Sequence, residues 1–328
     1  TLILRKVRLH MHILSDSEIE KQYLMADAIR DTQDLFPKLE QGQILVEHRT
    51  VMELPDTHNA MLYMPCLDLN EKLGTNKIIS IFPDNPKLNL PTTQGKILIT
   101  ELETGQHKAL IDASYLTRLR TGALSGIATH YLSRKDSRVL GVIGTGGMAF
   151  EQVLGILEVR NIEQIYLYNR TNEKAEIFKE KLIKFGINAE INVVKDVQEV
   201  VKQSDIINCA TRSNESVFDA IDLKQGAHIN GVGSYQPSMR EIDIKAIEQS
   251  SKIVFDDING AKTEAGEFIQ AEKDGHFSFD NAYSDLQQLA LGNIDGRTDE
   301  HEITIFKSVG AAHFDLAVGV GVFKKLLS

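Results

Sequence analysis

Residues 139–149 limit the fold of this chain more than any other stretch. The segment begins with apolar, mostly β-branched residues, as a buried strand does, and continues with Gly144, Gly146 and Ala149 in the spacing G-x-G-x-x-A. A helical pattern follows directly. Glycines at these positions permit a tight turn and let the backbone approach a pyrophosphate, and a small residue at 149 lets helix and strand pack closely. The segment therefore predicts a dinucleotide site, with a tight strand–helix turn that binds nothing as the alternative.

Strand and helix patterns alternate after this turn. We expect strands at 139–143, 164–168, 190–194 and 205–209, helices at 147–160, 172–185 and 196–203, and later strands at 227–232 and 253–255. Such alternation is typical of βαβ units that form a parallel sheet. The fold class predicted for this part is α/β, with a Rossmann-type parallel sheet.

The chain before the turn has a different pattern. Ser15 and Glu18 form a capping box, which predicts the start of a helix at 17–40. Runs of period two predict strands at 44–53, 60–66, 73–82, 96–101 and 107–111. A helix at 113–132 leads into the turn, and the apolar face of a last helix at 309–327 can return to these strands. This part is therefore predicted to be an α+β domain.

Composition excludes several classes of function. A net charge of −10 argues against nucleic acid and anionic membranes as partners. Cys66 and Cys209 lie outside any C-x-x-C, which is typical of a reducing compartment, so we expect a cytoplasmic protein. No apolar run reaches about 18 residues, so no membrane-spanning helix is expected. Residues 1–10 lack a small-residue cleavage site and are interpreted as an extension rather than a signal peptide. The histidines show no metal spacing, so no metal is predicted.

The end of the second predicted strand bears on the choice of cofactor. An acidic residue there would bind the adenosine ribose and select NAD, but the sequence has Asn169, Arg170 and Thr171. A neutral amide does not repel a 2′-phosphate, and an arginine can bind one through two hydrogen bonds. These residues favour NADP(H), with NAD(H) as the alternative. Otherwise, Asn169 is a turn residue, Arg170 a surface charge and Thr171 a helix cap.

Three cations lie in segments that are otherwise apolar or neutral. Arg120 falls within an apolar helical pattern, where its charge requires an anion, either a substrate carboxylate or a structural acid. Arg49 and Lys77 each fall in a strand-like run. Taken alone, each of these two is more often a surface charge.

Several further motifs occur in order along the chain: Pro91–Gly95, Leu119–Ala123, Asn230–Ser234, and Lys307–Gly310 with Asp315. Together with the glycine turn they make the chain resemble the ornithine cyclodeaminase/mu-crystallin family over nearly its whole length. The resemblance implies a substrate-binding and dimerisation domain at 1–122 with 310–328 returning to it, and a Rossmann domain at 123–309. It also implies a homodimer that transfers hydride between NAD(P) and a small carboxylate-bearing amino or imino acid.

The resemblance also assigns residues to the site. Arg49, Lys77 and Arg120 would hold the substrate carboxylate, and Lys77 would carry a proton. Thr92, Val309 and Gly310 would line the substrate pocket, and a helix that begins near 309 would offer free N–H groups. The cofactor-binding set implied is Thr121, Gly144, Thr145, Gly146, Gly147, Met148, Ala149, Asn169, Arg170, Thr171, Ala210, Thr211, Val232 and Ser308.

One position departs from the cyclodeaminating members, which carry an aspartate where this chain has Tyr235. A tyrosine has no negative charge at neutral pH and cannot pair with an ornithine ammonium, but it can donate a proton. Lys77 and Tyr235 are therefore the catalytic candidates. The prediction is an NAD(P)H-dependent reductase of cyclic ketimines such as pyrroline-2-carboxylate. The alternatives are ornithine cyclodeamination, an alanine dehydrogenase-like activity, and a non-catalytic NADP(H)- or small-ligand-binding protein of the mu-crystallin type.

Overall fold

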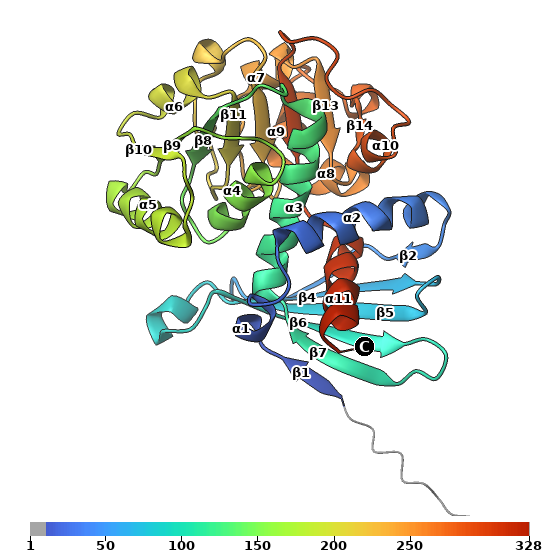
Figure 1. The fold of residues 1–328 in the computed structure, drawn as a ribbon. Coiled ribbons are helices and arrows are strands. Elements are labelled where there is room, and N and C mark those ends of the chain that lie inside the picture. Colours follow the sequence, from blue (N-terminus) through green and yellow to red (C-terminus); the bar gives the residue numbers. More distant parts are fainter. Residues whose placement is uncertain (1–10, 328) are drawn as a thin grey trace, which may run out of the picture. The chain divides into compact units, whose positions relative to one another are not determined.

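The computed structural model describes residues 11–327, so the predicted extension at 1–10 lies outside the described residues. The chain packs into two compact units (Figure 1). The first unit contains the described residues up to Leu24, residues Lys38–Thr117, and the chain from Ala312 onward. The second contains Met25–Pro37 and Arg118–Ala311. Both chain ends thus contribute to the first unit. The functional domains predicted at 1–122 with 310–328 and at 123–309 stay a prediction, since these units are grouped by packing alone.

The first unit is built on a seven-stranded sheet in the order β1-β7-β6-β5-β4-β2, with β3 also paired to β4. Its strands are β1 (His12–Leu14), β2 (Ile44–Val46), β3 (Thr50–Glu53), β4 (Ala60–Asp68), β5 (Leu73–Ile81), β6 (Thr93–Glu101) and β7 (His107–Asp112). All pairs are antiparallel except β1 with β7. The last helix, α11 (Ala312–Leu326), packs on β4, β5 and β6. Side chains alternate along β4, so Leu62, Met64, Cys66 and Asp68 are buried on one face of this strand.

Two predicted elements of the first half are divided in the structure. The helix expected at 17–40 is two helices, α1 (Asp16–Ile19) and α2 (Met25–Glu40), although the capping box is present and the Glu18 carboxylate accepts from Ser15 N at 2.8 Å. The strand expected at 44–53 is divided into β2 and β3. Across the first break, Tyr23 and Leu24 continue the apolar pattern of the helix, whereas the second break falls on the polar residues 47–49.

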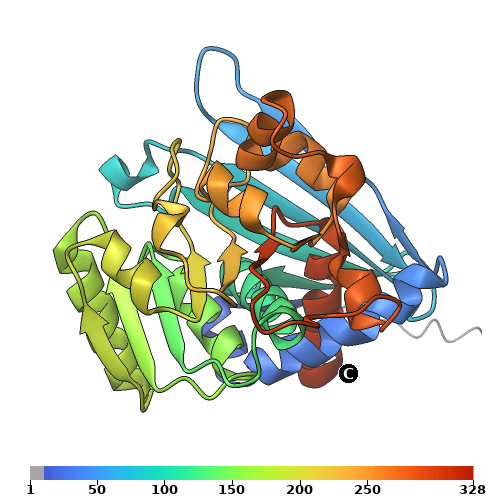
Figure 2. The ribbon, with the colours of Figure 1, turned by 90° about the horizontal axis from the view of Figure 1, so that it is seen from above.

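The second unit contains an eight-stranded sheet in the order β10-β9-β8-β11-β12-β15-β13-β14, parallel at every pair. Figure 2 shows the strands and helices of this unit in the colours from green to red. Its strands are β8 (Val139–Ile143), β9 (Gln164–Tyr168), β10 (Glu190–Val193), β11 (Ile206–Cys209), β12 (His228–Gly231), β13 (Lys252–Phe255), β14 (Ser284–Asp285) and β15 (Thr304–Lys307). Its helices are most of α2, most of α3 (Ser114–Leu132), α4 (Ala149–Leu157), α5 (Asn172–Phe185), α6 (Val197–Gln203), α7 (Ile244–Gln249), α8 (Ile258–Glu264), α9 (Gly266–Lys273) and α10 (Leu286–Ala290). The α/β fold class with a Rossmann-type sheet is confirmed.

Two apolar cores lie on opposite faces of this sheet. Ile206 packs in the core with α4 and α5, whereas the next residue, Ile207, packs in the core with α6 to α9. Successive strand residues point to opposite faces, so the helices cover both sides. Strand β15 was not predicted. It lies between β12 and β13, so the chain returns to the interior of the sheet after β14. The order of the elements along the sequence does not reveal this position.

None of the helices in residues 11–327 is long and apolar enough to cross a bilayer.

Candidate active site

The carboxyl ends of five parallel strands bring predicted cofactor residues to one edge of the second unit's sheet. Gly144 follows β8, Asn169 follows β9, Ala210 follows β11, Val232 follows β12 and Ser308 follows β15. Strand β8 pairs with β9 on one side and with β11 on the other, so the strand order reverses beside the glycine turn. Open α/β sheets bind their ligands at this kind of switch point.

The glycine turn has the shape that a pyrophosphate requires. Gly144 has φ +90°, and a Cβ there would lie 2.6 Å from Thr211 Cγ2 and 2.9 Å from the Ala210 carbonyl oxygen. A Cβ on Gly146 or Gly147 would meet no atom within 4 Å. The backbone of these two residues is therefore exposed to open space, while α4 begins directly after them. The turn fits a dinucleotide phosphate held by backbone N–H groups.

We expect Gly146→Ala to separate cofactor binding from folding. Because its Cβ meets only open space, the unliganded variant should keep its unfolding midpoint or gain slightly. The methyl group would occupy the space predicted for the phosphates, so the Kd for NADPH should rise at least about tenfold, as expected when backbone can no longer approach the pyrophosphate. Calorimetric titration and thermal unfolding measure the two effects. Gly144→Ala, with its positive φ, should lose both binding and stability, and unchanged affinity in Gly146→Ala would contradict the assignment.

The Asn169 side chain connects the glycine turn to the next helix. Its Oδ1 accepts from Thr145 N at 3.2 Å, and its Nδ2 donates to the Thr171 carbonyl at 3.0 Å. Thr171 is the N-cap residue of α5, and Arg170 is exposed between the two. Asn169 thus has the structural role of a turn residue. Arg170 and Thr171 are exposed, and the contact of these three residues with a cofactor stays a prediction.

Lys77 is one of the most deeply buried charges of the first unit. It lies in β5 on the face under α11, with 3% of its side chain exposed. Its Nζ donates to Asp315 Oδ1 at 2.7 Å, and the Asp315 side chain is 1% exposed. Asp315 was noted as part of a motif but was given no partner. The two residues are 238 positions apart, so only the fold could show that they pair.

Arg49 and Thr92 also belong to the first unit. Arg49 lies in the connection between β2 and β3, half-buried, and so the prediction that it sits in a strand is wrong. Thr92 directly precedes β6, and its carbonyl accepts from Phe82 N at 2.7 Å. Arg120, Thr121, Tyr235, Val309 and Gly310 belong to the second unit. The convergence of the three cations on one carboxylate stays a prediction.

Arg120 lies against the segment that follows β15. It is 7% exposed in α3, and a Cβ added to Gly310 would lie 2.7 Å from its Nη2. The expectation of free N–H groups at this segment is wrong, because Val309 N and Gly310 N donate to the buried Asp256 carboxylate at 3.1 and 2.8 Å. Helix α11 begins only at Ala312.

A buried polar network holds Gly233 and Ser234, which directly precede Tyr235. The Glu241 carboxylate accepts from Gly233 N at 2.6 Å and Ser234 N at 3.0 Å, and also from Thr211 N. Burial raises the pKa of the Glu241 carboxyl. Lys307 Nζ lies 3.0 Å from Glu267 Oε1 and donates to the Ser234 carbonyl at 2.6 Å. The network therefore joins the ends of β11, β12 and β15. Ser234 and Lys307 both belong to motifs noted in the sequence, but their pairing across 73 positions was not predicted. Tyr235 itself is half-buried.

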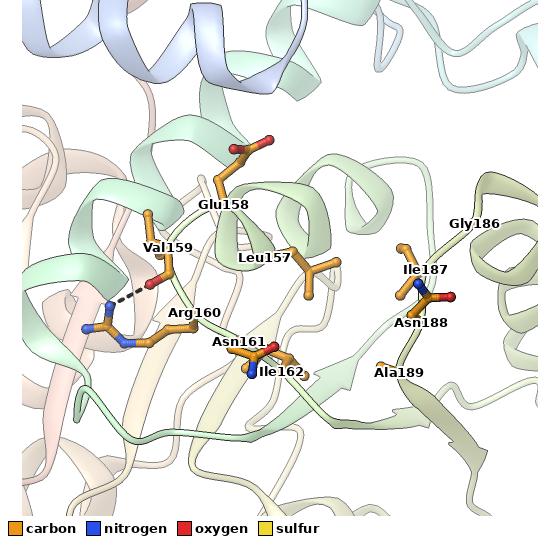
Figure 3. A pocket seen from close by; sticks show the side chains of 10 residues that line it. All are labelled: Leu157, Glu158, Val159, Arg160, Asn161, Ile162, Gly186, Ile187, Asn188 and Ala189. Carbon is orange, nitrogen blue, oxygen red and sulfur yellow. Dashed lines mark hydrogen bonds between the residues drawn. The ribbon is translucent and has the colours of Figure 1, made fainter.

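A pocket of about 540 Å³ lies at the other edge of the sheet (Figure 3). It is lined by residues 157–162, which precede β9, and by residues 186–189, which precede β10. The Arg160 guanidinium is engaged by backbone carbonyls, among them that of Val159 at 2.7 Å. The pocket is therefore at the amino ends of the strands, away from the glycine turn. Within residues 11–327, no group of three His, Cys, Asp or Glu side chains is placed to hold a metal ion.

Comparison with known proteins agrees with this architecture. Residues 10–328 match the model of the ornithine cyclodeaminase/mu-crystallin family. A Delta(1)-pyrroline-2-carboxylate reductase of Bacillus cereus is 38% identical over 281 residues, which are 85% of each chain. The structure of the Thermococcus litoralis Delta(1)-pyrroline-2-carboxylate reductase in complex with NADH and L-proline matches with a TM-score of 0.91 and 35% identity, over 97% of this chain and 98% of that one. An archaeal alanine dehydrogenase dimer with bound NAD matches with a TM-score of 0.89 and 30% identity, over 97% and 96% of the two chains. The chain belongs to the ornithine cyclodeaminase/mu-crystallin family.

Proposed function

We propose that this protein is an NAD(P)H-dependent reductase of a small cyclic imino acid, of the pyrroline-2-carboxylate type. The observation that carries the proposal is the likeness, over 97% of the chain, to a reductase whose structure holds NADH and L-proline. The glycine turn supports it, because its open backbone fits the pyrophosphate of such a cofactor.

The chain's own residues then have distinct tasks. A bound NAD(P)H supplies the hydride for the carbon of the C=N bond. Arg49, Lys77 and Arg120 hold the carboxylate and so orient that bond. Reduction also requires a proton at nitrogen, which Lys77 donates from Nζ. Asp315 Oδ1 accepts from that atom at 2.7 Å and so fixes its position.

Tyr235 is the second candidate for the proton. It follows the Gly233–Ser234 segment that Glu241 and Lys307 hold in place. A phenol and a lysine ammonium are acids of similar strength, so the choice between them depends on which group lies closer to the nitrogen. Tyr235→Phe removes the phenol proton and keeps the ring. Comparing the loss of kcat in this variant with the loss in a Lys77 variant shows which group donates the proton.

A steady-state assay tests the proposal. Oxidation of NADPH or NADH with pyrroline-2-carboxylate is expected to exceed ammonia release from ornithine and oxidation of L-alanine. Turnover of alanine alone would favour an alanine dehydrogenase, and ornithine turnover a cyclodeaminase. Calorimetric binding of NADPH without any turnover would favour the non-catalytic binding protein.

The preference for NADP(H) over NAD(H) is part of the proposal and depends on Arg170. This side chain is exposed after β9, where a 2′-phosphate would lie. We expect Arg170→Ala to lower the ratio of kcat/KM for NADPH to that for NADH by about 10- to 100-fold, the value of a charge-assisted contact to phosphate. Arg138→Ala, which removes a half-exposed arginine before β8, is the matched control. An unchanged ratio would make Arg170 a surface charge.

A homodimer formed through the first unit is also part of the proposal. The sheet face away from α11 carries a row of apolar side chains that are only partly buried: Tyr63, Pro65, Leu67, Ile78, Leu98, Leu110 and the exposed Ile13. Such a face requires cover, and an apolar patch of this kind marks an interface. The dimer of the similar alanine dehydrogenase supports a second copy as the cover.

Leu98→Lys is expected to give a monomer, because it places a charge in the middle of this face. Sedimentation velocity measures the change. Ile177→Lys in α5, at a residue that is 65% exposed, is the control and should leave the assembly as in the wild type. A wild-type protein that sediments as a monomer would remove this part of the proposal.

The buried free thiols of Cys66 and Cys209 support the proposed cytoplasmic location.

A further inference from the structure

The carboxylate of Asp256 organises the segment that follows β15. Asp256 comes directly after β13, is 4% exposed, and pairs its backbone N–H with the Lys307 carbonyl at 3.0 Å. Its side chain accepts from Ser308 Oγ at 2.6 Å, Val309 N at 3.1 Å and Gly310 N at 2.8 Å. Three donors from three consecutive residues thus converge on one buried carboxylate. A neutral side chain could not accept all three, since an amide has a single oxygen acceptor.

The segment held in this way forms a surface against Arg120. Gly310 adopts φ +84°, and a Cβ built on it would lie 2.7 Å from Nη2, 3.0 Å from Nη1 and 3.3 Å from Cζ of Arg120. The guanidinium therefore rests on the Gly310 backbone, with no room for a side chain between them. Arg120, Asp256 and residues 308–310 all belong to the second unit.

We propose that Asp256 is a positioning residue that acts through Ser308–Gly310 to set the orientation of the Arg120 guanidinium, and thereby the affinity for the carboxylate of the imino acid. Arg120 binds a planar carboxylate well only when its fork of N–H groups is correctly aimed. Gly310 supplies the surface that aims it, and Asp256 fixes that surface. The proposal rests on the reductase activity proposed above.

The test is Asp256→Asn in the full-length protein. We expect KM for pyrroline-2-carboxylate to rise about 10- to 100-fold, as for loss of an aligned charge-assisted contact, with a much smaller change in kcat. Asp243→Asn is the matched control, since its carboxylate also accepts backbone N–H groups in the second unit, from Ala220 at 2.9 Å and Lys245 at 3.2 Å. It should leave KM and kcat as in the wild type.

A double-mutant cycle separates positioning from general loss of structure. If Asp256 acts through Arg120, the rise in KM caused by Asp256→Asn should be largely lost in an Arg120→Lys background, because coupled residues are not additive. Additive effects would overturn the proposal. Asp256→Glu, which keeps the charge, should restore part of the affinity and serves if Asp256→Asn fails to fold.

A crystal structure of the variant provides a reading that does not depend on activity. In Asp256→Asn, or in Asp256→Glu if the former does not fold, residues 308–310 and the Arg120 guanidinium should be displaced from their wild-type positions. An unmoved guanidinium would overturn the inference even if the enzyme is active. If the wild type reduces no imino acid, the proposed function fails, while the displacement still decides whether Asp256 positions Arg120.

Discussion

Lys77→Met is expected to lower kcat/KM for the imino acid by about a thousandfold or more, the upper range for loss of a positioned acid. Methionine has nearly the length of lysine and fits the buried place in β5, but it has no charge and no proton. Cofactor binding should persist, because the glycine turn belongs to the other unit. Steady-state kinetics measure kcat/KM, and titration with NADPH measures cofactor binding. Lys72→Met is the control, since Lys72 and its partner Glu103 are both 61% exposed.

Variants of the Lys77–Asp315 pair should lose stability and activity to different extents. Lys77→Met leaves the Asp315 carboxylate buried without its ammonium, and breaking a buried pair from one side costs about 3 to 5 kcal/mol. The double variant Lys77→Met/Asp315→Asn should recover part of the unfolding free energy and none of the activity. A Lys77→Met enzyme within tenfold of the wild type would exclude Lys77 as the proton donor and leave Tyr235.

Gly155→Val is expected to lower the free energy of unfolding by more than about 3 kcal/mol, beyond the usual cost of overpacking. Helices α3 and α4 cross with their backbones in contact. A Cβ on Gly155 would overlap the Gly122 carbonyl, and one on Gly122 would overlap the Glu151 carbonyl. A Cβ on Gly126 would lie 2.5 Å from the Gly155 oxygen. Backbone atoms cannot rotate away as side chains do, so the helices themselves must separate.

Denaturant unfolding measures the loss, and Gly147→Ala is the control because its Cβ would meet nothing within 4 Å. The crossing also matters for the site. Arg120 and Thr121 directly precede Gly122 on α3, and α4 begins at the end of the glycine turn. We therefore expect Gly122→Ala, the milder change, to weaken NADPH binding as well as stability. A Gly155→Val protein as stable as the wild type would show that the helices are not held so close.

The sequence predicted those parts of the fold that depend on neighbouring residues. The strand–turn–helix around Gly144, the alternation after it and the helix at 113–132 were predicted from periodicity and glycine spacing, and the structure confirms them. The break at 20–24 was missed because Tyr23 and Leu24 continue the apolar periodicity, and the break at 47–49 was missed although its three residues are polar. Strand β15 was missed because a four-residue buried strand carries too little pattern of its own.

Contacts between residues distant in sequence were also the part of the candidate site that could not be predicted. The cations and the glycine turn could be proposed from residue type and from motifs. Their partners could not, because Lys77 meets Asp315 across 238 residues and Asp256 meets Ser308 across 52. Charge pairing at such separations is decided by which strands become neighbours. The Asp256 carboxylate, one residue beyond the strand predicted at 253–255, is an acceptor for three donors of a distant segment.

The pairing of Lys77 with Asp315 also has a consequence for biosynthesis. A ribosome produces β5 long before it produces α11, so the nascent sheet carries a lysine whose counter-charge has not yet been translated. The first unit can therefore complete its interior only after nearly all of the polypeptide has emerged, whereas most of the Rossmann sheet can form earlier. Premature termination shortly before residue 312 should leave a chain that chaperones and proteases recognise as unfinished.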